Sequence, residues 1–167
     1  MIYLITGGTR SGKSSFALNL AKNSKNPFFI ATGWAGDNEM SDRIKKHKKE
    51  RNKIWTTLEE RFDLNAAIVL AIKQNADFII IDCLTLWTSN LMYSKKDIKS
   101  YLSNLIKTLT NTEISIVLVT NEVGLGIVPN SKDGREFRDT LGLINQKLAK
   151  AADKVIFMVS GIPIELK

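Results

Sequence analysis

The chain has 167 residues, of which 44% are hydrophobic, and its 24 Lys and Arg against 17 Asp and Glu give a net charge of +7. A chain of this length buries roughly 70% of the surface that its unfolded form exposes, so we expect one domain over residues 1–167 with a core that needs no disulfide. One Cys and one His exclude an internal disulfide and a Cys/His zinc site, and no apolar run approaches the length of a membrane span, so we expect a cytoplasmic protein without one.

The first predicted elements are a strand at residues 2–6 and a helix at residues 13–22, joined by a glycine-rich loop. The loop has the pattern G-x-x-x-x-G-K-[ST] and consists of Gly7, Gly8, Thr9, Arg10, Ser11, Gly12, Lys13 and Ser14. Its glycines let consecutive backbone N–H groups turn toward an anion, and the following helix adds the positive end of its dipole. We expect Lys13 to reach the β- and γ-phosphates of a nucleoside triphosphate and the Ser14 hydroxyl to bind Mg²⁺.

A strand predicted at residues 28–32 is followed by a basic helix predicted at residues 38–51. Residues 43–53 carry seven Lys and Arg and one Glu, a local charge of +6, whereas the other 156 residues carry +1. Residues four apart share a helix face, which places His47, the only histidine, between Arg43 and Arg51. Two guanidiniums suit a polyphosphate, and nearby cations favour a neutral, nucleophilic imidazole. An ordinary solvated surface helix would show the same spacing, which leaves both interpretations open.

A helix predicted at residues 62–74 leads to a strand at residues 78–82 that ends in a carboxylate. Four apolar residues precede Asp82. P-loop enzymes usually place an acid at the end of a neighbouring strand, where it holds Mg²⁺ directly or through water. A strand-terminal Asp is also a common turn residue, but the P-loop upstream makes the metal-linked role the one that we expect for Asp82.

The rest of the chain continues the alternation of helices and strands. A helix is predicted at residues 96–108, a strand at 115–120, a helix at 135–151 and a strand at 155–160. The segment 124–134 contains three glycines and a proline, which is typical of a substrate loop or of a plain connection. A short apolar tail at residues 162–166 predicts an edge strand, because Pro163 cannot donate to an inner ladder.

The order of these elements predicts the fold class. Strands that are apolar on both faces and alternate with helices indicate a mainly parallel sheet that helices cover on both sides. With the P-loop, the class is α/β, a three-layer P-loop NTPase fold of the RecA-like kind.

Several further motifs complete a pattern that extends over nearly the whole chain. They are R-x-x-x-H-x-x-x-R at residues 43–51, Asn-Glu-Val-Gly at 121–124, Gly-Ile-Val-Pro at 126–129, Phe-Arg-Asp at 137–139 and Val-Ser-Gly at 159–161. Together with the P-loop, they resemble the bifunctional adenosylcobinamide kinase/adenosylcobinamide-phosphate guanylyltransferase family of cobalamin biosynthesis. The P-loop alone is shared by many NTPases, whereas the other motifs are far more diagnostic.

The resemblance implies two reactions. The protein would phosphorylate the aminopropanol hydroxyl of adenosylcobinamide with ATP or GTP. It would then take GMP from GTP onto a histidine, matched here by His47, and pass it to adenosylcobinamide phosphate to give adenosylcobinamide-GDP. A P-loop supplies no nucleophile for the second reaction, and a histidine does. Arg43 and Arg51 would stabilise charge on the transferring and leaving phosphates, and copies of the chain would assemble as a homo-oligomer.

The resemblance also implies the nucleotide contacts. Besides the P-loop, they comprise Thr32, Gly33, Trp34, Lys48, Lys49, Glu50, Arg51, Glu59 and Asp82. The base that takes the proton of the cobinamide hydroxyl stays open among Glu59, Glu122 and Asp139.

Two other functions stay compatible with the sequence. A P-loop small-molecule kinase would use the basic helix as a lid and would lack guanylyltransferase activity. A nucleic-acid-binding module would use the same cations, but such modules interleave aromatic residues with them, and residues 43–53 contain none. We therefore expect no nucleic-acid partner.

Overall fold

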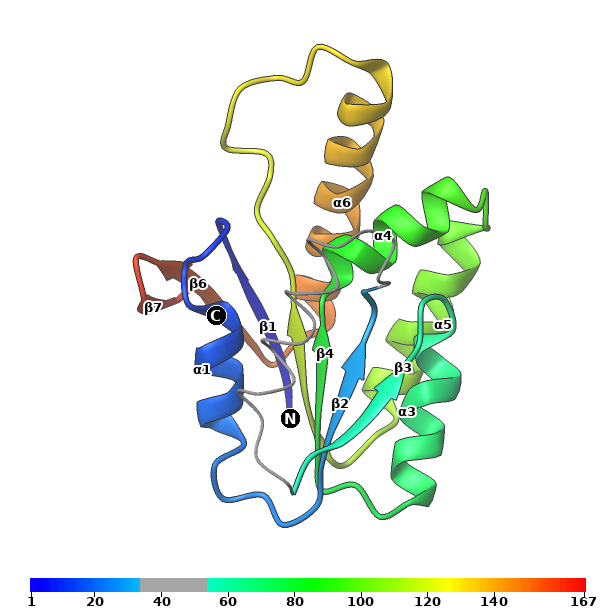
Figure 1. Cartoon of the computed structure of the whole chain (residues 1–167), viewed down its shortest axis with the longest axis vertical. Helices are drawn as coiled ribbons and strands as arrows, with labels where there is room; N and C mark the ends of the chain where they lie inside the picture. The colour runs from blue at the N-terminus through cyan, green and yellow to red at the C-terminus, as the bar shows by residue number, and fades with distance from the viewer. Residues whose placement is uncertain (34–53) are drawn as a thin grey trace.

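The computed structural model describes residues 1–33 and 54–167, and these residues form one seven-stranded sheet with helices on both faces (Figure 1). The strands are β1 (Ile2–Gly7), β2 (Pro27–Ala31), β3 (Thr56–Glu59), β4 (Phe78–Asp82), β5 (Ser115–Val119), β6 (Lys154–Val159) and β7 (Ile162–Glu165). Their order across the sheet is β3-β2-β4-β5-β1-β6-β7, and β7 alone among them runs antiparallel to its neighbour. The predicted α/β class is therefore confirmed, as is an edge position for Pro163.

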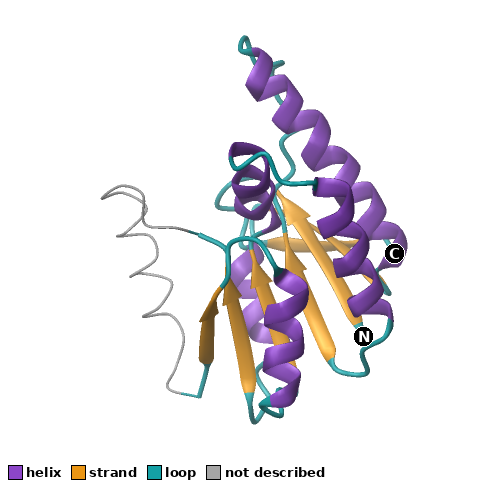
Figure 2. Cartoon of the chain, turned by 90° about the vertical axis from the view of Figure 1, so that its right-hand side faces the viewer, coloured by secondary structure: helices purple, strands orange, loops and turns teal. Residues whose placement is uncertain are grey.

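The described helices form two layers around the sheet (Figure 2). They are α1 (Lys13–Leu20), α3 (Leu64–Lys73), α4 (Leu84–Tyr93), α5 (Ile98–Thr110) and α6 (Lys132–Ala151). Buried residues of α1 pack against one face of the sheet, and those of the other four helices belong to a second core on the opposite face. Because β1 to β6 run parallel, their carboxyl ends lie at one edge of the sheet, where P-loop proteins bind their ligands.

Strand β4 shows why the inner strands are continuously apolar. Ile79 and Ile81 belong to the core beneath α3, α4, α5 and α6, whereas Phe78 and Ile80 belong to the core beneath α1. Successive side chains of a strand point to opposite faces. A strand between two helical layers must therefore be apolar at every position, and its first polar residue, Asp82, marks the carboxyl edge.

Side-chain caps fix where three helices begin. Asp63 accepts a hydrogen bond from the backbone N–H of Ala66 at 3.0 Å, at the start of α3, and Asp97 caps α5 in the same way. At α6, the Ser131 hydroxyl accepts from the N–H of Gly134 at 3.1 Å. Such caps satisfy N–H groups that have no partner within the helix. Residues 132–134 are thus helical, and the prediction of an irregular segment that extends to residue 134 was wrong in its last turn.

Two elements were not predicted, and one predicted element cannot be compared. Strand β3 has only four residues, none of them fully buried, and lacks the apolar run of the inner strands. Helix α4 begins two residues after β4 ends, and the side chain of its N-terminal residue Cys83 makes no cap. The helix predicted at residues 38–51 lies outside the described residues.

The opposite edge of the sheet is held by Asp77, in the loop before β4. Its carboxylate accepts hydrogen bonds from the Ser24 hydroxyl and from the backbone N–H groups of Lys25 at 2.7 Å and Asn26 at 3.1 Å. Asp77 therefore joins the loop before β4 to the loop before β2.

None of the described helices combines the length and the hydropathy that crossing a membrane requires.

Candidate nucleotide site

The loop between β1 and α1 has the backbone of an anion cradle. Gly7 and Gly12 have φ of 147° and 94°, and Arg10 has φ of 57°. A Cβ on Gly7 would stand 2.5 Å from the carbonyl oxygen of Met158 and 2.9 Å from the Ser11 hydroxyl. Glycine is thus required at position 7 both by conformation and by space.

Two neighbouring segments hold this loop from the side. The backbone N–H of Gly161, in the turn after β6, donates to the carbonyl oxygen of Ser11 at 3.0 Å. The N–H of Glu122, which follows β5, donates to the carbonyl oxygen of Gly7 at 3.0 Å. Since β5 and β6 flank β1 in the sheet, the loop is braced by both neighbours of the strand that carries it.

Lys13 is buried within the loop, with 8% of its surface exposed. Its Nζ donates to the carbonyl oxygens of Gly7 at 3.0 Å and Gly8 at 2.6 Å. Burial lowers the pKa of Lys13, and the nearby Asp82 carboxylate works in the other direction. A buried ammonium beside turned backbone amides is the arrangement that holds the phosphates of a nucleotide.

Ser14 and Asp82, the two residues that the sequence assigns to Mg²⁺, lie within hydrogen-bond distance of each other. The Ser14 hydroxyl donates to Oδ2 of Asp82 at 2.7 Å. Ser14 lies in the first turn of α1 and Asp82 at the end of β4, so this contact joins residues 68 apart in sequence. A hydroxyl and a carboxylate are hard oxygen donors of the kind that Mg²⁺ prefers, and the pair therefore fits that ion.

Thr32 and Cys83 form a clasp beside Asp82. The Thr32 hydroxyl donates to the carbonyl oxygen of Cys83 at 2.7 Å and accepts from the Cys83 N–H at 2.9 Å. Burial, with a further contribution from the Asp82 charge, raises the pKa of the Cys83 thiol to about 12. Because the thiolate is the reactive form, Cys83 is no nucleophile near neutral pH, and Thr32 orders the backbone that carries Asp82.

Glu59, the last residue of β3, lies at the same carboxyl edge of the sheet as Asp82. The strand registers place Glu59 opposite Ala31 and Ala31 opposite Asp82. With neighbouring strands about 4.8 Å apart, the Cα atoms of Glu59 and Asp82 are separated by roughly 10 Å. Glu59 therefore lies at the same edge of the sheet as Asp82, two strands away from it.

Of the remaining predicted residues, Gly33 is described and follows Thr32 directly. Trp34, Arg43, His47, Lys48, Lys49, Glu50 and Arg51 all lie outside the described residues. The structure therefore brings together the P-loop, Ser14, Asp82 and Thr32, and leaves the expected nucleophile untested.

A hydrogen-bonded set behind the site was not assigned a role from the sequence. The Thr120 hydroxyl donates to Oδ1 of Asn145 at 2.9 Å, and Nδ2 of Asn145 donates to the carbonyl oxygen of Asn121 at 3.2 Å. The N–H of Asn121 donates to the Thr85 hydroxyl at 2.8 Å. These contacts tie the end of β5 to α4 and α6. The sequence signal that could have indicated this set is the pair of polar residues, Thr120 and Asn121, that directly follows the buried strand β5.

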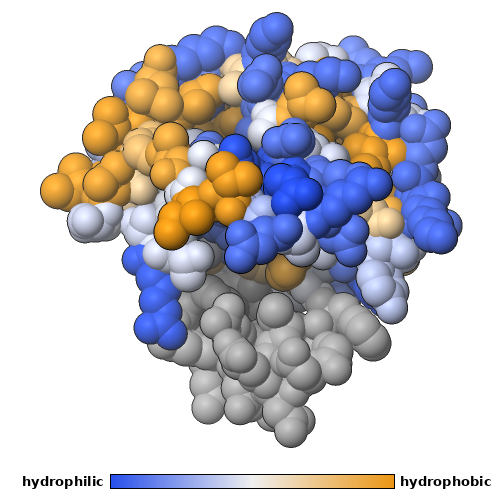
Figure 3. All heavy atoms as spheres, turned by 90° about the horizontal axis from the view of Figure 1, so that it is seen from above, coloured by the Kyte–Doolittle hydropathy of each residue, from blue (hydrophilic) through white to orange (hydrophobic). Residues whose placement is uncertain are grey.

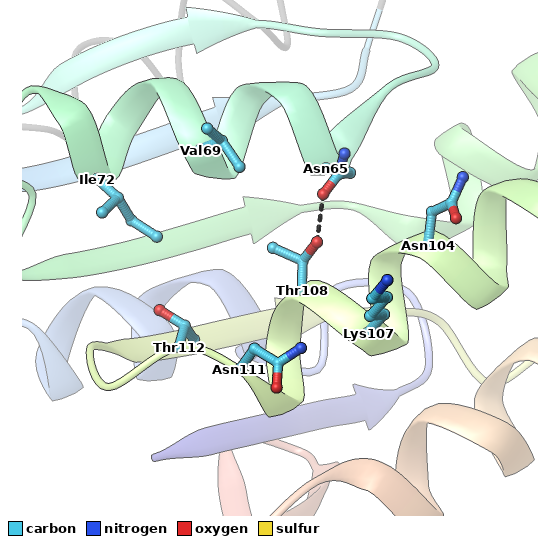
Figure 4. Close-up of a pocket in the computed structure, with 8 residues that line it drawn as sticks. All are labelled: Asn65, Val69, Ile72, Asn104, Lys107, Thr108, Asn111 and Thr112. Carbon is cyan, nitrogen blue, oxygen red and sulfur yellow. Dashed lines mark hydrogen bonds between the residues drawn. The ribbon is translucent and has the colours of Figure 1, made fainter.

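A hollow lies between α3 and α5, on the face of the sheet opposite α1. It has a volume of about 460 Å³, and Asn65, Val69, Asn104, Lys107 and Asn111 are among the residues that line it (Figure 4). The Thr108 hydroxyl donates to Oδ1 of Asn65 across it. The groove has one titratable group, Lys107, and no carboxylate. It therefore offers no machinery for phosphoryl transfer.

The braced P-loop, the buried lysine and the Ser14–Asp82 pair on a mainly parallel sheet define a P-loop nucleotide-binding protein. The fold agrees with that of a KaiC-like protein from Pyrococcus horikoshii, whose crystal structure matches with a TM-score of 0.54 at 19% identity. The match covers 93% of this chain and 69% of the other. At this level of identity, the likeness concerns the fold alone.

The chain belongs to the cobinamide kinase/cobinamide phosphate guanyltransferase family, whose model matches residues 3–166. It is 37% identical to the bifunctional adenosylcobalamin biosynthesis protein CobU of Escherichia coli, over the whole of both chains. It is 39% identical to the corresponding protein CobP of Pseudomonas aeruginosa, covering 98% of this chain and 96% of the other. The resemblance that the sequence motifs indicated is thereby confirmed.

Proposed function

We propose that this chain phosphorylates adenosylcobinamide with ATP or GTP, and then transfers GMP from GTP to adenosylcobinamide phosphate. The observation that carries the proposal is the family match over residues 3–166, on a chain whose P-loop already assembles a buried Lys13 and the Ser14–Asp82 pair. These are the parts that position a triphosphate and neutralise its charge.

In the first reaction, the hydroxyl oxygen of cobinamide attacks the γ-phosphorus. The bond between the γ-phosphorus and the bridging oxygen of the β-phosphate breaks, and the nucleoside diphosphate leaves. Lys13 and the backbone N–H groups of the P-loop hold the phosphates, and the hydroxyl proton passes to a carboxylate of the chain.

Of the three carboxylates that the sequence left open, we assign this proton to Glu122. Its backbone bonds to Gly7 at 3.0 Å, and its Oε1 accepts from the N–H of Gly124 at 2.6 Å, which orients the carboxylate. Glu59 is on β3, four strands away from β1, a separation of roughly 19 Å. Asp139 is exposed on α6, whereas Glu122 follows β5, the strand beside β1.

We assign Mg²⁺ to the oxygen atoms of Ser14 and Asp82, which are 2.7 Å apart. When bound, Mg²⁺ neutralises charge on the β- and γ-phosphates. Asp82 then holds its position through the Thr32–Cys83 clasp, which fixes the backbone of the residue that follows the carboxylate.

The second reaction requires attack at the α-phosphorus of GTP, and we assign the nucleophile to His47. An imidazole nitrogen bonds to the α-phosphorus, and pyrophosphate leaves. A phosphate oxygen of cobinamide phosphate then attacks the same phosphorus, and the P–N bond breaks to release cobinamide-GDP and free His47. Arg43 and Arg51 are assigned to the charge on the transferring and leaving phosphates. The sequence spacing supports these assignments.

For the rest of the nucleotide, we propose contacts along the edge of the sheet from Asp82 to Glu59. Thr32 and Gly33 follow β2, which lies between β4 and β3. Trp34, Lys48, Lys49 and Glu50 are added on the family resemblance. We further propose that residues 1–167 act as one domain, since all described strands join one sheet. On the family resemblance, we also propose that the protein is cytoplasmic and forms a homo-oligomer.

Labelled nucleotide tests the function. With α-labelled GTP, the chain should acquire label in an acid-labile, base-stable bond, and the His47→Ala variant should acquire none while it still phosphorylates cobinamide. The label in the wild-type chain should pass to cobinamide phosphate when that substrate is added. Unchanged labelling of His47→Ala would remove His47 from the mechanism, whereas phosphorylation by a wild-type chain that never takes label would leave a simple P-loop kinase.

A further inference from the structure

The loop between β5 and α6 exposes apolar side chains at the edge of the sheet that carries the P-loop. Leu125 is 81% exposed, Ile127 is 96% exposed and Val128 is 55% exposed. Seen from above, toward the carboxyl ends of the parallel strands, the molecule shows apolar side chains gathered in groups between polar ones (Figure 3). Three exposed aliphatic residues within four positions leave an apolar surface in contact with water, which typically marks a binding site.

Both ends of this loop are held in place. At its start, Oε1 of Glu122 accepts from the N–H of Gly124 at 2.6 Å. At its end, the Arg135 guanidinium donates to the carbonyl oxygens of Pro129 at 3.0 Å and Asn130 at 2.7 Å. These contacts hold the loop on either side of residues 125–128, whose apolar side chains are exposed to solvent.

The apolar stretch begins three residues after Glu122, which is bonded to the phosphate cradle. The backbone of Glu122 is bonded to Gly7 at 3.0 Å. Leu125 is three residues further on, so its Cα lies within about 11 Å of that of Glu122 whatever path the loop takes. A molecule resting on residues 125–128 can therefore present a hydroxyl or a phosphate to a nucleotide held by the P-loop.

We propose that residues 125–128 form the platform that holds the corrin ring of the cobinamide substrate, an inference that rests on the proposed function. The corrin macrocycle is broad and largely apolar, and it carries amide arms at its rim. The apolar contact comes from Leu125, Ile127 and Val128. The backbone amides of the loop supply hydrogen-bonding groups for the amide arms at the rim of the ring.

The composition of the loop disfavours the other occupants. Residues 124–130 contain no charged side chain, so they offer nothing to the phosphates of a second nucleotide. Three aliphatic side chains on one loop also supply far less area than the roughly 800 Å² per partner of a stable subunit contact. A medium-sized amphiphilic molecule with a broad apolar face is the ligand that the surface fits.

Equilibrium dialysis of cobinamide, followed by its visible absorbance, tests the platform without requiring any reaction. The variant Leu125→Ser/Ile127→Ser should bind cobinamide at least tenfold more weakly than the wild type. Its affinity for GTP and its labelling by α-labelled GTP should stay within twofold of wild type. In the kinase assay, the KM for cobinamide should rise while kcat at saturating cobinamide changes little.

Leu166→Ser is the matched control. Leu166 is 62% exposed, and its N–H bonds to Val155 at the start of β6, so it lies at the opposite end of the parallel strands. This variant should bind cobinamide as the wild type does. Unchanged cobinamide affinity in the loop variant would overturn the platform, and so would a loss of GTP labelling or a lower oligomeric mass by light scattering. Wild-type chain that binds cobinamide without phosphorylating it would instead overturn the proposed function and leave the platform standing.

Discussion

At the scale of single residues, Lys13 shows how one charge serves both the fold and the site. Its ammonium donates to the carbonyl oxygens of Gly7 and Gly8, and so closes the loop on which it stands. Burial disfavours the charged form, which is why its pKa is lowered. Nucleotide phosphates would favour the charged form again, so binding energy and the protonation of Lys13 are coupled.

The role of Glu122 can be separated from that of His47. Glu122→Gln keeps an acceptor for the Gly124 N–H but removes the carboxylate, so we expect phosphorylation of cobinamide to fall about 10²- to 10⁴-fold. Transfer of α-label from GTP to the chain should persist, because that step does not use the hydroxyl of cobinamide. Separate initial-rate assays of the two steps measure this. Asp139→Gln is the comparison, and a loss of kinase rate there, with Glu122→Gln unaffected, would move the base to α6.

At the scale of elements, the sequence predicted the strands that carry chemistry better than those that complete the sheet. The buried run before Asp82 was identified with its boundaries, because two helical layers force every position to be apolar. Strand β3 was missed because an edge strand of four half-exposed residues needs no such run. Helix α4 was missed although Leu84, Trp87 and Leu91 have helical spacing, because only Cys83 separates it from β4 and the Cys83 side chain makes no cap.

The same reasoning separates what was predictable in the site. The P-loop and Asp82 follow from motif and position, since their spacing reflects a fixed mechanism. The brace from Gly161 to Ser11 depends on the pairing of β6 with β1, residues about 150 apart in sequence. The clasp between Thr32 and Cys83 likewise depends on which strands are neighbours. Strand order is a property of the packed sheet, and no local pattern encodes it.

The turn that Asp77 holds between two elements has a pH-dependent stability. Slight burial opposes ionisation of Asp77, but the Ser24 hydroxyl and the N–H groups of Lys25 and Asn26 outweigh it and hold its pKa below the usual value. Ionised Asp77 therefore stabilises the fold above the unfolded-state pKa of about 3.9, and this contribution is lost as the pH falls through the lower folded-state pKa. We expect Asp77→Asn to lower the free energy of unfolding by about 1–2 kcal/mol at pH 7.

Urea denaturation of wild type and Asp77→Asn between pH 7 and pH 3 checks this dependence. The difference between the two proteins should shrink as the pH approaches the acidic end. Glu113→Gln, which removes another exposed loop carboxylate at the same edge, should have little effect at any pH. A difference for Asp77→Asn that stays constant over the whole range would contradict the hydrogen-bonded carboxylate.

At the scale of the whole molecule, two cores of unequal size hold the sheet between them. The larger core takes buried residues from four helices and from five strands, and the smaller one takes them from α1 and from strands. Trp87 is the largest fully buried side chain of the molecule's described residues, and its Nε1 donates to the carbonyl oxygen of Phe62 at 2.7 Å. It thus ties α4, which follows β4, to the segment before α3.

Replacing Trp87 should therefore destabilise the whole fold. Trp87→Ala leaves a large cavity, and we expect it to lower the free energy of unfolding by about 3–5 kcal/mol. Trp87→Phe keeps most of the apolar volume and should cost less, with the lost hydrogen bond accounting for about 1–2 kcal/mol. Guanidinium denaturation followed by circular dichroism measures both, and an alanine variant no less stable than the phenylalanine one would refute the packing argument.

The position of β1 in the sheet determines at which stage of synthesis the nucleotide site can be completed. Its phosphate loop leaves the ribosome well before residue 161, yet the strand lies between β5 and β6, and the Gly161 N–H closes the loop at Ser11. A growing chain that has not reached residue 161 therefore carries an unfinished nucleotide site. Triphosphate affinity should be gained late in synthesis, after nearly all of the sheet has formed.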